Sequence, residues 1–335
     1  MLKEKMNLLI KIFCITVAMV VLAAAPYFLS RSYVMILRQI LVFAAFSLSW
    51  YFFSGITKYI SLGSVAFVGT GIYFTSVYLY GIHLPNPLFP FLPFPVIVIL
   101  AGLICFALAF AIGLISLRLK GIYFAIATFG VGQLVGGIFS WWQNETRFVP
   151  INIPIPVQYT RDFNLQYYSV LTATVATFFI ITTLLLRSKF GLALRMIGDC
   201  EEAAAHSGVN TTLYKTLGFA ISAFFMGLAG GSYTISFYSL NLSSVFSVDY
   251  SFLPPVMVLL GGVGTVYGSM IGPPLLILIS EYLRQTIVGG YYQITYGIIL
   301  VIIILFAPNG IMGVIGKLKS AKPLKGKIAK PIVEP

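Results

Sequence analysis

Long apolar runs separated by short polar breaks make up most of the chain. Taken between polar residues, they predict membrane-crossing segments at 9–29, 34–57, 62–80, 95–117, 121–142, 167–186 and 216–238, a glycine-interrupted pair within 251–283, and a last segment at 287–307. Each run is close to the roughly 20 residues that an α-helix needs to cross a bilayer. The pattern predicts an all-α bundle of about ten membrane segments, with broken or re-entrant helices, in which residues 1–335 form a single transmembrane domain.

The composition supports a membrane protein and excludes a soluble one. Apolar residue types make up 59% of the 335 residues and charged types 9%, and no soluble packing scheme could bury this much hydrocarbon. The net charge of +12 does not point to nucleic acid. Its Lys and Arg residues sit at the ends of apolar runs and in the tail, without a basic groove or an aromatic platform.

The basic residues predict the orientation of the chain. If six segments precede residue 187, the following fall on one side: Lys3, Lys5, Lys11, Lys58, Arg118, Lys120, Arg187, Lys189, Arg195 and the lysines of the tail 314–335. Positive residues favour the cytoplasmic side, so we expect a multi-pass protein of the cytoplasmic membrane with both termini inside. The outer face then carries loops 81–95, 143–166 and 239–250, and 187–215 is the longest inner loop.

Candidate chemistry within the membrane is sparse. An ionisable side chain at the bilayer centre costs about 2.5–3.5 kcal/mol on insertion scales and is kept where it has a function, and the apolar runs carry none at mid-span. This counts against a proton-coupled carrier, although a sodium site built from backbone carbonyls would escape the argument. No catalytic constellation supports a membrane enzyme, and the isolated His and Cys residues predict no metal site.

One inner loop concentrates negative charge. Asp199, Glu201 and Glu202 supply three of the nine acidic residues within four positions. Asp199 followed three residues later by Glu202 predicts a helix-capping arrangement with acids in the first turn. The following alanines propagate a helix, and Gly208 can close it. We expect a short helix over 199–208, with Cys200, Ala203, Ala204 and Ser207 as a face of small side chains. That face suits close approach to a partner, but a solvated, capped connector explains the same pattern.

Several stretches together resemble the branched-chain amino acid permeases of the LivM type, a family of ABC importer subunits. They are SLGSVAFVGTGIY (61–73), LRLKGIYFAIATFGVGQL (117–134), GLALRMIGDCEEAAAHSGVNTTLYKTLGFAISAFFMGLAGG (191–231), MVLLGGVGTVYGSMIG (257–272) and LFAPNGIMG (305–313). Glu202, Ala203, Ala204 and Gly208 resemble the EAA loop of ABC importer permeases. Ser64 stands where relatives often carry His and Gln133 where they often carry Glu.

The resemblance implies a permease half that works with other chains. They are a second permease subunit, two ABC ATPase subunits and an extracytoplasmic substrate-binding protein. ATP would be bound by the ATPase, so no cofactor and no enzymatic activity is expected here. Residues 199–208 would be the coupling helix, with Asp199, Glu201, Glu202, Ala203, Ala204 and Gly208 at the ATPase. Related permeases carry urea or short amides, and a self-contained secondary carrier is the alternative from another class.

Two glycine-interrupted segments, 61–71 and 261–272, mark candidate broken helices along a substrate path. The candidate path residues are Ser61, Gly63, Ser64, Thr128, Gln133, Gly261, Gly262, Gly264 and Thr265. The alternative is that the glycines let helices pack closely and that the polar side chains bind neighbouring helices. Arg147 and Arg161, in an outer loop, are candidates for docking the binding protein.

Overall fold

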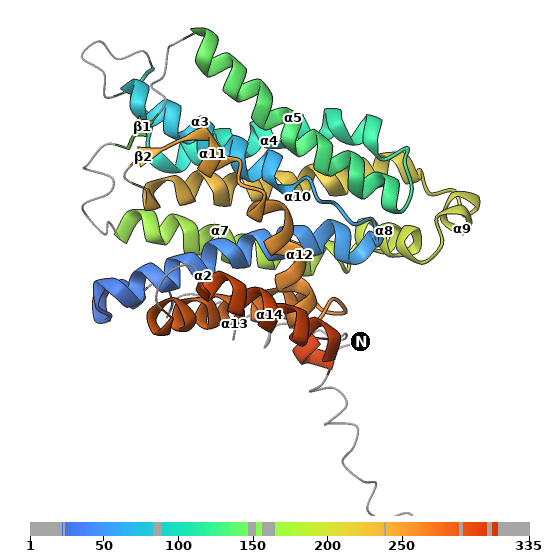
Figure 1. Cartoon of the computed structure of the whole chain (residues 1–335). Helices are drawn as coiled ribbons and strands as arrows, with labels where there is room; N and C mark the ends of the chain where they lie inside the picture. Colours follow the sequence, from blue (N-terminus) through green and yellow to red (C-terminus); the bar gives the residue numbers. More distant parts are fainter. Residues whose placement is uncertain are drawn as a thin grey trace, which may run out of the picture.

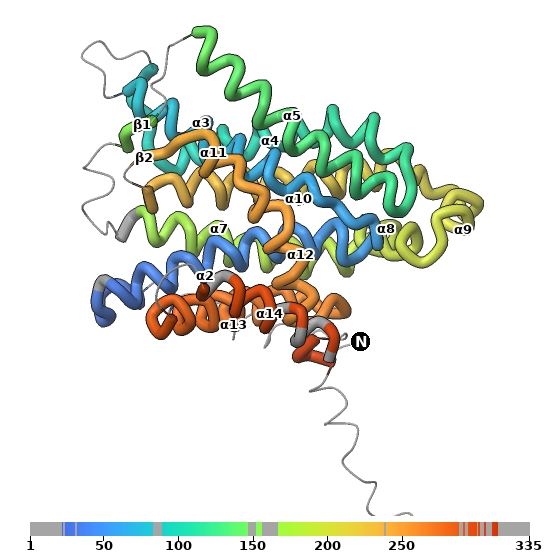
Figure 2. Tube along the Cα trace, viewed as in Figure 1, coloured from blue at the N-terminus to red at the C-terminus, as the bar shows by residue number. Residues whose placement is uncertain are grey.

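The computed structural model describes residues 22, 24–82, 89–146, 152–155, 165–237, 239–287, 291–306 and 310–313. Figure 2 traces the chain through its elements. In order they are α2 (Arg31–Trp50), the π-helix η1 (Tyr51–Gly55), α3 (Ser64–Ile82), α4 (Phe94–Ser116), α5 (Ile122–Thr146), β1 (Ile153–Pro154), α7 (Leu165–Leu185), α8 (Lys189–Asp199), α9 (Glu201–His206), α10 (Thr211–Tyr233), the 3-10 helix η2 (Thr234–Ser236), β2 (Ser239–Leu240), α11 (Leu242–Val245), α12 (Asp249–Gly261), α13 (Val266–Thr286) and α14 (Tyr291–Phe306).

Eight helical segments of the described part are long and apolar enough to cross a membrane. They cover Ser32–Gly55, Ser64–Ile82, Phe94–Ser116, Ile122–Thr146, Tyr167–Leu185, Thr211–Ser236, Leu242–Gly261 and Val266–Thr286. The predicted all-α membrane bundle is therefore confirmed, and each run from 34–57 onward has a helical counterpart. The last run, 287–307, yields α14 with 16 residues, and the run 9–29 lies mostly outside the described residues.

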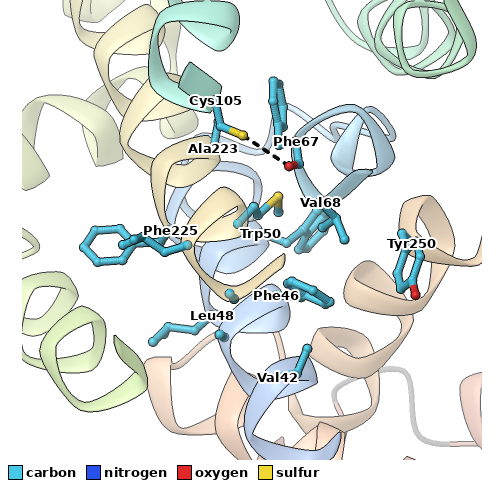
Figure 3. Close-up of a cluster of buried hydrophobic side chains, with 14 of the residues drawn as sticks. Val42, Phe46, Leu48, Trp50, Phe67, Val68, Cys105, Ala223, Phe225 and Tyr250 are labelled. Carbon is cyan, nitrogen blue, oxygen red and sulfur yellow. Dashed lines mark hydrogen bonds between the residues drawn. The ribbon is translucent and has the colours of Figure 1, made fainter. Parts of the chain in front are cut away.

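The core is built around α10, which packs against α2, α3, α4 and α7. Figure 3 shows part of this core, where Phe46, Phe67 and Phe225 come from different helices. Glycines allow the closest approaches. A Cβ on Gly71 of α3 would collide with the backbone of Gly227 in α10, so the two helices approach through their main chains, as small residues permit in membranes. The packing interpretation is thus correct for Gly71, which lies inside a continuous helix.

The two ends of the bundle differ in what they carry (Figure 1). At one end, β1 and β2 pair antiparallel, with Ile153 opposite Leu240 and Pro154 opposite Ser239. At the other end, α8 and α9 project beyond the long helices (Figure 1). The predicted inner lysines Lys58 and Lys120 both contact this α8–α9 segment. The two chain termini, including the tail 314–335, lie outside the described residues.

Candidate functional site

The inner loop folds as two helices where one was predicted. Asp199 is the last residue of α8, Cys200 is extended with φ −159° and ψ 106°, and α9 begins at Glu201. The N-terminus of α9 has no side-chain cap, so the expectation that Asp199 caps a helix over 199–208 is wrong. Cys200 occupies the N-cap position instead, and the Asp199 carboxylate accepts a hydrogen bond from Lys58 Nζ at 3.0 Å.

The other end of α9 is closed as predicted. Gly208 has φ +83°, a left-handed conformation that glycine adopts without a steric penalty. The Val209 N–H donates to the Ala204 carbonyl at 3.1 Å, and the Gly208 N–H donates to the Ala205 carbonyl at 3.0 Å. This is the Schellman arrangement, which satisfies carbonyl groups at a helix C-terminus.

Each of the three acids pairs with a lysine from a different part of the chain. Asp199 pairs with Lys58 and Glu202 with Lys120, at 3.0 and 3.8 Å, and all four side chains are more than 60% exposed. Exposed pairs of this kind contribute about 0–1 kcal/mol. Glu201 differs, because its pair with Lys215 at 2.5 Å leaves the lysine side chain 4% and the glutamate 19% exposed. The acidic cluster thus contains two surface pairs and one buried pair.

Lys215, in the first turns of α10, has a full set of partners. Its Nζ donates to Glu201 Oε1 at 2.5 Å, to the Leu117 carbonyl at 3.2 Å and to the Tyr59 hydroxyl at 3.3 Å. The ammonium also lies 4.7 Å from the centroid of the Tyr59 ring. Tyr59 in turn donates its hydroxyl hydrogen to Glu201 Oε2. Breaking such a buried pair by removing one partner typically costs about 3–5 kcal/mol.

The protonation states of this cluster follow from its contacts. Burial acts to raise the pKa of Glu201, but hydrogen bonds from Lys215 and Tyr59 and the charges of Lys215 and Lys120 outweigh it and lower the pKa below its usual 4.5. Burial and the bond to Glu201 raise the pKa of Tyr59. At neutral pH Glu201 is therefore a carboxylate, and Tyr59 keeps the proton that it donates.

The predicted small face of α9 is only partly exposed. Ala204 is buried at 1% exposure, so its side chain points into the chain. Cys200, Ala203 and Ser207 are exposed, as is Ala205, which the prediction omitted. Ala203 and Ser207 lie on one exposed side of α9, and Glu202 and His206 are exposed between them and Ala205. The expectation that Ala204 belongs to the exposed face is therefore wrong.

Next to this loop, the chain is interrupted between η1 and α3. Residues 58–63, called the first break below, are not helical, and Lys58 begins them with φ +59°, which costs an L-residue roughly 1–2 kcal/mol. The carbonyl of Ile56, just before the break, is so close to Gly198 of α8 that a Cβ there would collide with it. The first break and the α8–α9 segment are thus in direct contact.

Side chains hold the backbone of the first break. The Ser61 N–H donates to Ser54 Oγ at 3.2 Å, the Leu62 N–H donates to Thr128 Oγ1 at 3.1 Å, and Trp50 Nε1 donates to the Ser61 carbonyl at 2.8 Å. Ser61 Oγ accepts from the Gly63 N–H at 3.4 Å. Backbone polar groups that are buried outside a helix require such protein partners. Of the candidate path residues, Ser61, Gly63, Ser64 and Thr128 therefore come together here.

Ser64 and Gln133 do not hydrogen-bond the backbone of the first break through their side chains. Ser64 is 1% exposed, and its Oγ has no hydrogen-bond partner among the described residues. It lines a cavity of about 10 Å³ together with Ser54, Ser61 and Ser222, which is room for about one water molecule. Gln133 is exposed on α5 and does not join the group.

The second glycine segment forms its own turn. Gly261 ends α12, Gly262 has φ +115°, and Thr265 caps α13 by accepting a hydrogen bond from the Gly268 N–H at 3.1 Å. A Cβ on Gly264 would meet no atom within 4 Å. The predicted break in 261–272 is thus the turn at 262–265, called the second turn below. Arg147 and Arg161, the candidate docking residues, lie outside the described residues.

Sequence reasoning missed Lys215 and Tyr59. The available signal was a lysine among apolar residues early in α10, within TTLYKTLGFAI, because a charge at such a position is buried only when it is paired. In the described part of the chain, no three His, Cys, Asp or Glu side chains gather as metal ligands would.

Comparisons with known proteins match the chain to permeases. The model of the family described as "Branched-chain amino acid transport system / permease component" matches residues 32–307. "High-affinity branched-chain amino acid transport system permease protein LivM" of Salmonella typhimurium is 25% identical over 329 residues, 88% of this chain and 73% of that protein. The Escherichia coli protein of the same name is 25% identical over 326 residues, 88% and 74%.

Sugar permeases also match, over less of the chain. "Ribose import permease protein RbsC" of Haemophilus influenzae is 27% identical over 126 residues, 36% of this chain and 39% of that protein. No solved structure matches.

Proposed function

Because the chain belongs to the branched-chain amino acid transport system permease family, we propose that it is the permease subunit of an ABC importer for branched-chain or other small amino acids. The two LivM proteins match over most of both chains, whereas the ribose permease matches over about a third of this one. Amino acids are therefore the favoured substrate class. Urea and short amides are the alternative within the family.

The proposed assembly contains a second permease subunit, two ATPases and an extracytoplasmic binding protein, with ATP bound by the ATPase. In this assembly the present chain is not an enzyme. It lies in the cytoplasmic membrane with the α9 end and both termini facing the cytoplasm. The binding protein docks on the opposite face, with Arg147 and Arg161 as contact candidates.

The observation that carries the proposal is the placement of α9. This short helix projects at one end of the bundle (Figure 1), exposes Ala203, Ala205 and Ser207, and is fixed to the membrane helices by Glu201 and Lys215. Small exposed side chains allow close approach of another protein, and a rigid attachment lets that contact act on the helices. We assign α9 as the ATPase contact, with Asp199, Glu201 and Glu202 holding it and Gly208 closing it.

Uptake into proteoliposomes tests the function. The complete transporter should accumulate leucine, isoleucine or valine only when ATP and the binding protein are supplied. Uptake that persists without ATP would identify a secondary carrier. Preferential uptake of urea would show that the substrates are urea or short amides and not amino acids. Ala203→Trp tests the contact, because a large side chain on the exposed face should reduce ATPase recovery on purification. Ser244→Trp, exposed in α11 beside the β strands, is the matched control and should recover ATPase normally.

A further inference from the structure

Four separate parts of the chain meet at the ammonium of Lys215. Its three N–H donors bind Glu201 at the start of α9, the carbonyl of Leu117 just after α4, and Tyr59 in the first break. The lysine itself belongs to α10, the helix at the centre of the bundle. Because an ammonium has three donors, the group is saturated and has no donor left for water or another partner.

The cluster resists separation because it is buried. Moving Glu201 away would leave the Lys215 charge inside the protein without its counterion, which is strongly unfavourable. The exposed pairs of Asp199 and Glu202 differ, because water can replace either partner there at little cost. If α9 moves, Lys215 and Tyr59 therefore move with it. The Tyr59 hydroxyl binds the second oxygen of Glu201.

The first break, to which Tyr59 belongs, lies next to the candidate substrate path. Tyr59 lies two positions before Ser61 and five before Ser64, the residues that line the small serine cavity. Gly198 at the end of α8 also contacts the carbonyl of Ile56, two positions before the first break. Both contacts lead from the α8–α9 segment to the same stretch of backbone.

We propose that Glu201, Lys215 and Tyr59 form a link that carries movement of α9 to the first break, and that they are positioning residues for transport. The proposal rests on the function proposed above, in which an ATPase engages α9. The link converts a change at the ATPase contact into a change of the non-helical backbone at 58–63, beside the candidate path residues.

The test uses the complete transporter in proteoliposomes and the double variant Lys215→Met/Glu201→Gln. This pair removes both charges, so no buried ion is left unpaired, and the glutamine oxygen can still accept the Tyr59 hydroxyl. We expect the amount of amino acid transported per ATP hydrolysed to fall at least about fivefold, the lower end of ordinary coupling between two sites. Hydrogen exchange at residues 58–63 should depend on the nucleotide state in the wild type and lose that dependence in the variant.

Two further variants sharpen the outcome. Tyr59→Phe keeps the ring beside the ammonium and removes only the hydroxyl, so it should lower transport per ATP even if the double variant assembles poorly. Gln285→Ala, which removes an exposed side chain of α13 that bonds Glu281 outside the cluster, should leave that ratio unchanged. Wild-type transport per ATP in Tyr59→Phe or in an assembled double variant overturns the link. Failure of the wild type itself to show ATP-driven uptake counts against the proposed function instead.

Discussion

The first break at 58–63 and the second turn at 262–265 each connect two apolar helices, but different parts of the chain contact them. In the first break, the Leu62 N–H is bound by Thr128 of α5, and the loop helices α8 and α9 contact the same region. In the second turn the hydrogen bonds are local, since the Gly262 N–H binds Val258 and the Gly268 N–H binds Thr265, and the distant contact is the close approach of Gly310 to the Gly262 backbone. A hydrogen bond to a distant helix makes the first break sensitive to movement of that helix, whereas local hydrogen bonds move with the second turn.

The largest effect is expected from Gly261→Ala in the second turn. A Cβ at this position would collide with the backbone of Gly268, and backbone cannot move aside as a flexible side chain can. Overpacking of this kind costs about 1–3 kcal/mol and occasionally more. Thermal unfolding in detergent should show the loss. The matched control is Gly264→Ala in the same turn, where the added methyl group meets no atom and unfolding should stay close to wild type.

Equal unfolding temperatures for the two alanine variants would show that α12 and α13 are not packed as closely as described. The second turn would then lack the close packing of Gly261 on Gly268 that fixes its shape.

Thr128→Val should have the next largest effect, in the first break. The substitution preserves shape and removes the acceptor for the partly buried Leu62 N–H, and a fully buried unsatisfied donor costs about 1–3 kcal/mol, which is the upper bound here. Because the bond joins α5 to the break, hydrogen exchange should accelerate at residues 58–63. Thr128→Ser keeps the acceptor and should restore slow exchange. Acceleration confined to α5 would contradict the long-range attachment of the break.

Thr265→Val is the corresponding change in the second turn and should have a smaller effect. It removes a helix cap at the start of α13, for which the typical cost is about 1 kcal/mol. Hydrogen exchange should increase only in the first turn of α13, and Thr265→Ser should behave as wild type. An increase that reached residues 58–63 would show that the first break and the second turn are coupled.

The amino-acid sequence was sufficient to predict the membrane helices, because an apolar run of about 20 residues has few other stable solutions. It also predicted how α9 ends, since Gly208 closes the helix through bonds to residues three to five positions away. Both predictions depend on local information.

The sequence was not sufficient to predict how α9 begins. Asp199 and Glu202 have the spacing of a helix cap, but Lys58, 141 positions from Asp199, binds that carboxylate instead. Lys215 is buried only because Glu201, Leu117 and Tyr59 converge on it from three directions. Such contacts depend on how the helices are arranged in space, which the pattern of apolar runs does not specify.

The smallest effect on stability is expected from Ser64→Ala. This substitution tests whether the first break contributes to transport as well as to the fold. The Ser64 hydroxyl is buried without a hydrogen-bond partner among the described residues, so its removal leaves no group unsatisfied. We expect unfolding to change by no more than about 0.5 kcal/mol, as for substitutions outside the strongly destabilising classes. The neighbouring Ser61 and Thr128 cannot serve as this test, because their hydroxyl groups hold the backbone.

Transport by Ser64→Ala then separates two interpretations of the serine cavity. In this conformation the cavity of about 10 Å³ holds no more than about one water molecule, so an amino acid can reach Ser64 only after the first break opens. If opening of the break exposes the path, Ser64→Ala should reduce ATP-driven uptake severalfold at unchanged stability, and Ser64→Thr, which keeps a hydroxyl, should lose less. Unchanged uptake and unchanged stability together would remove Ser64 from the path and leave the first break as a structural joint, without contact to the transported molecule.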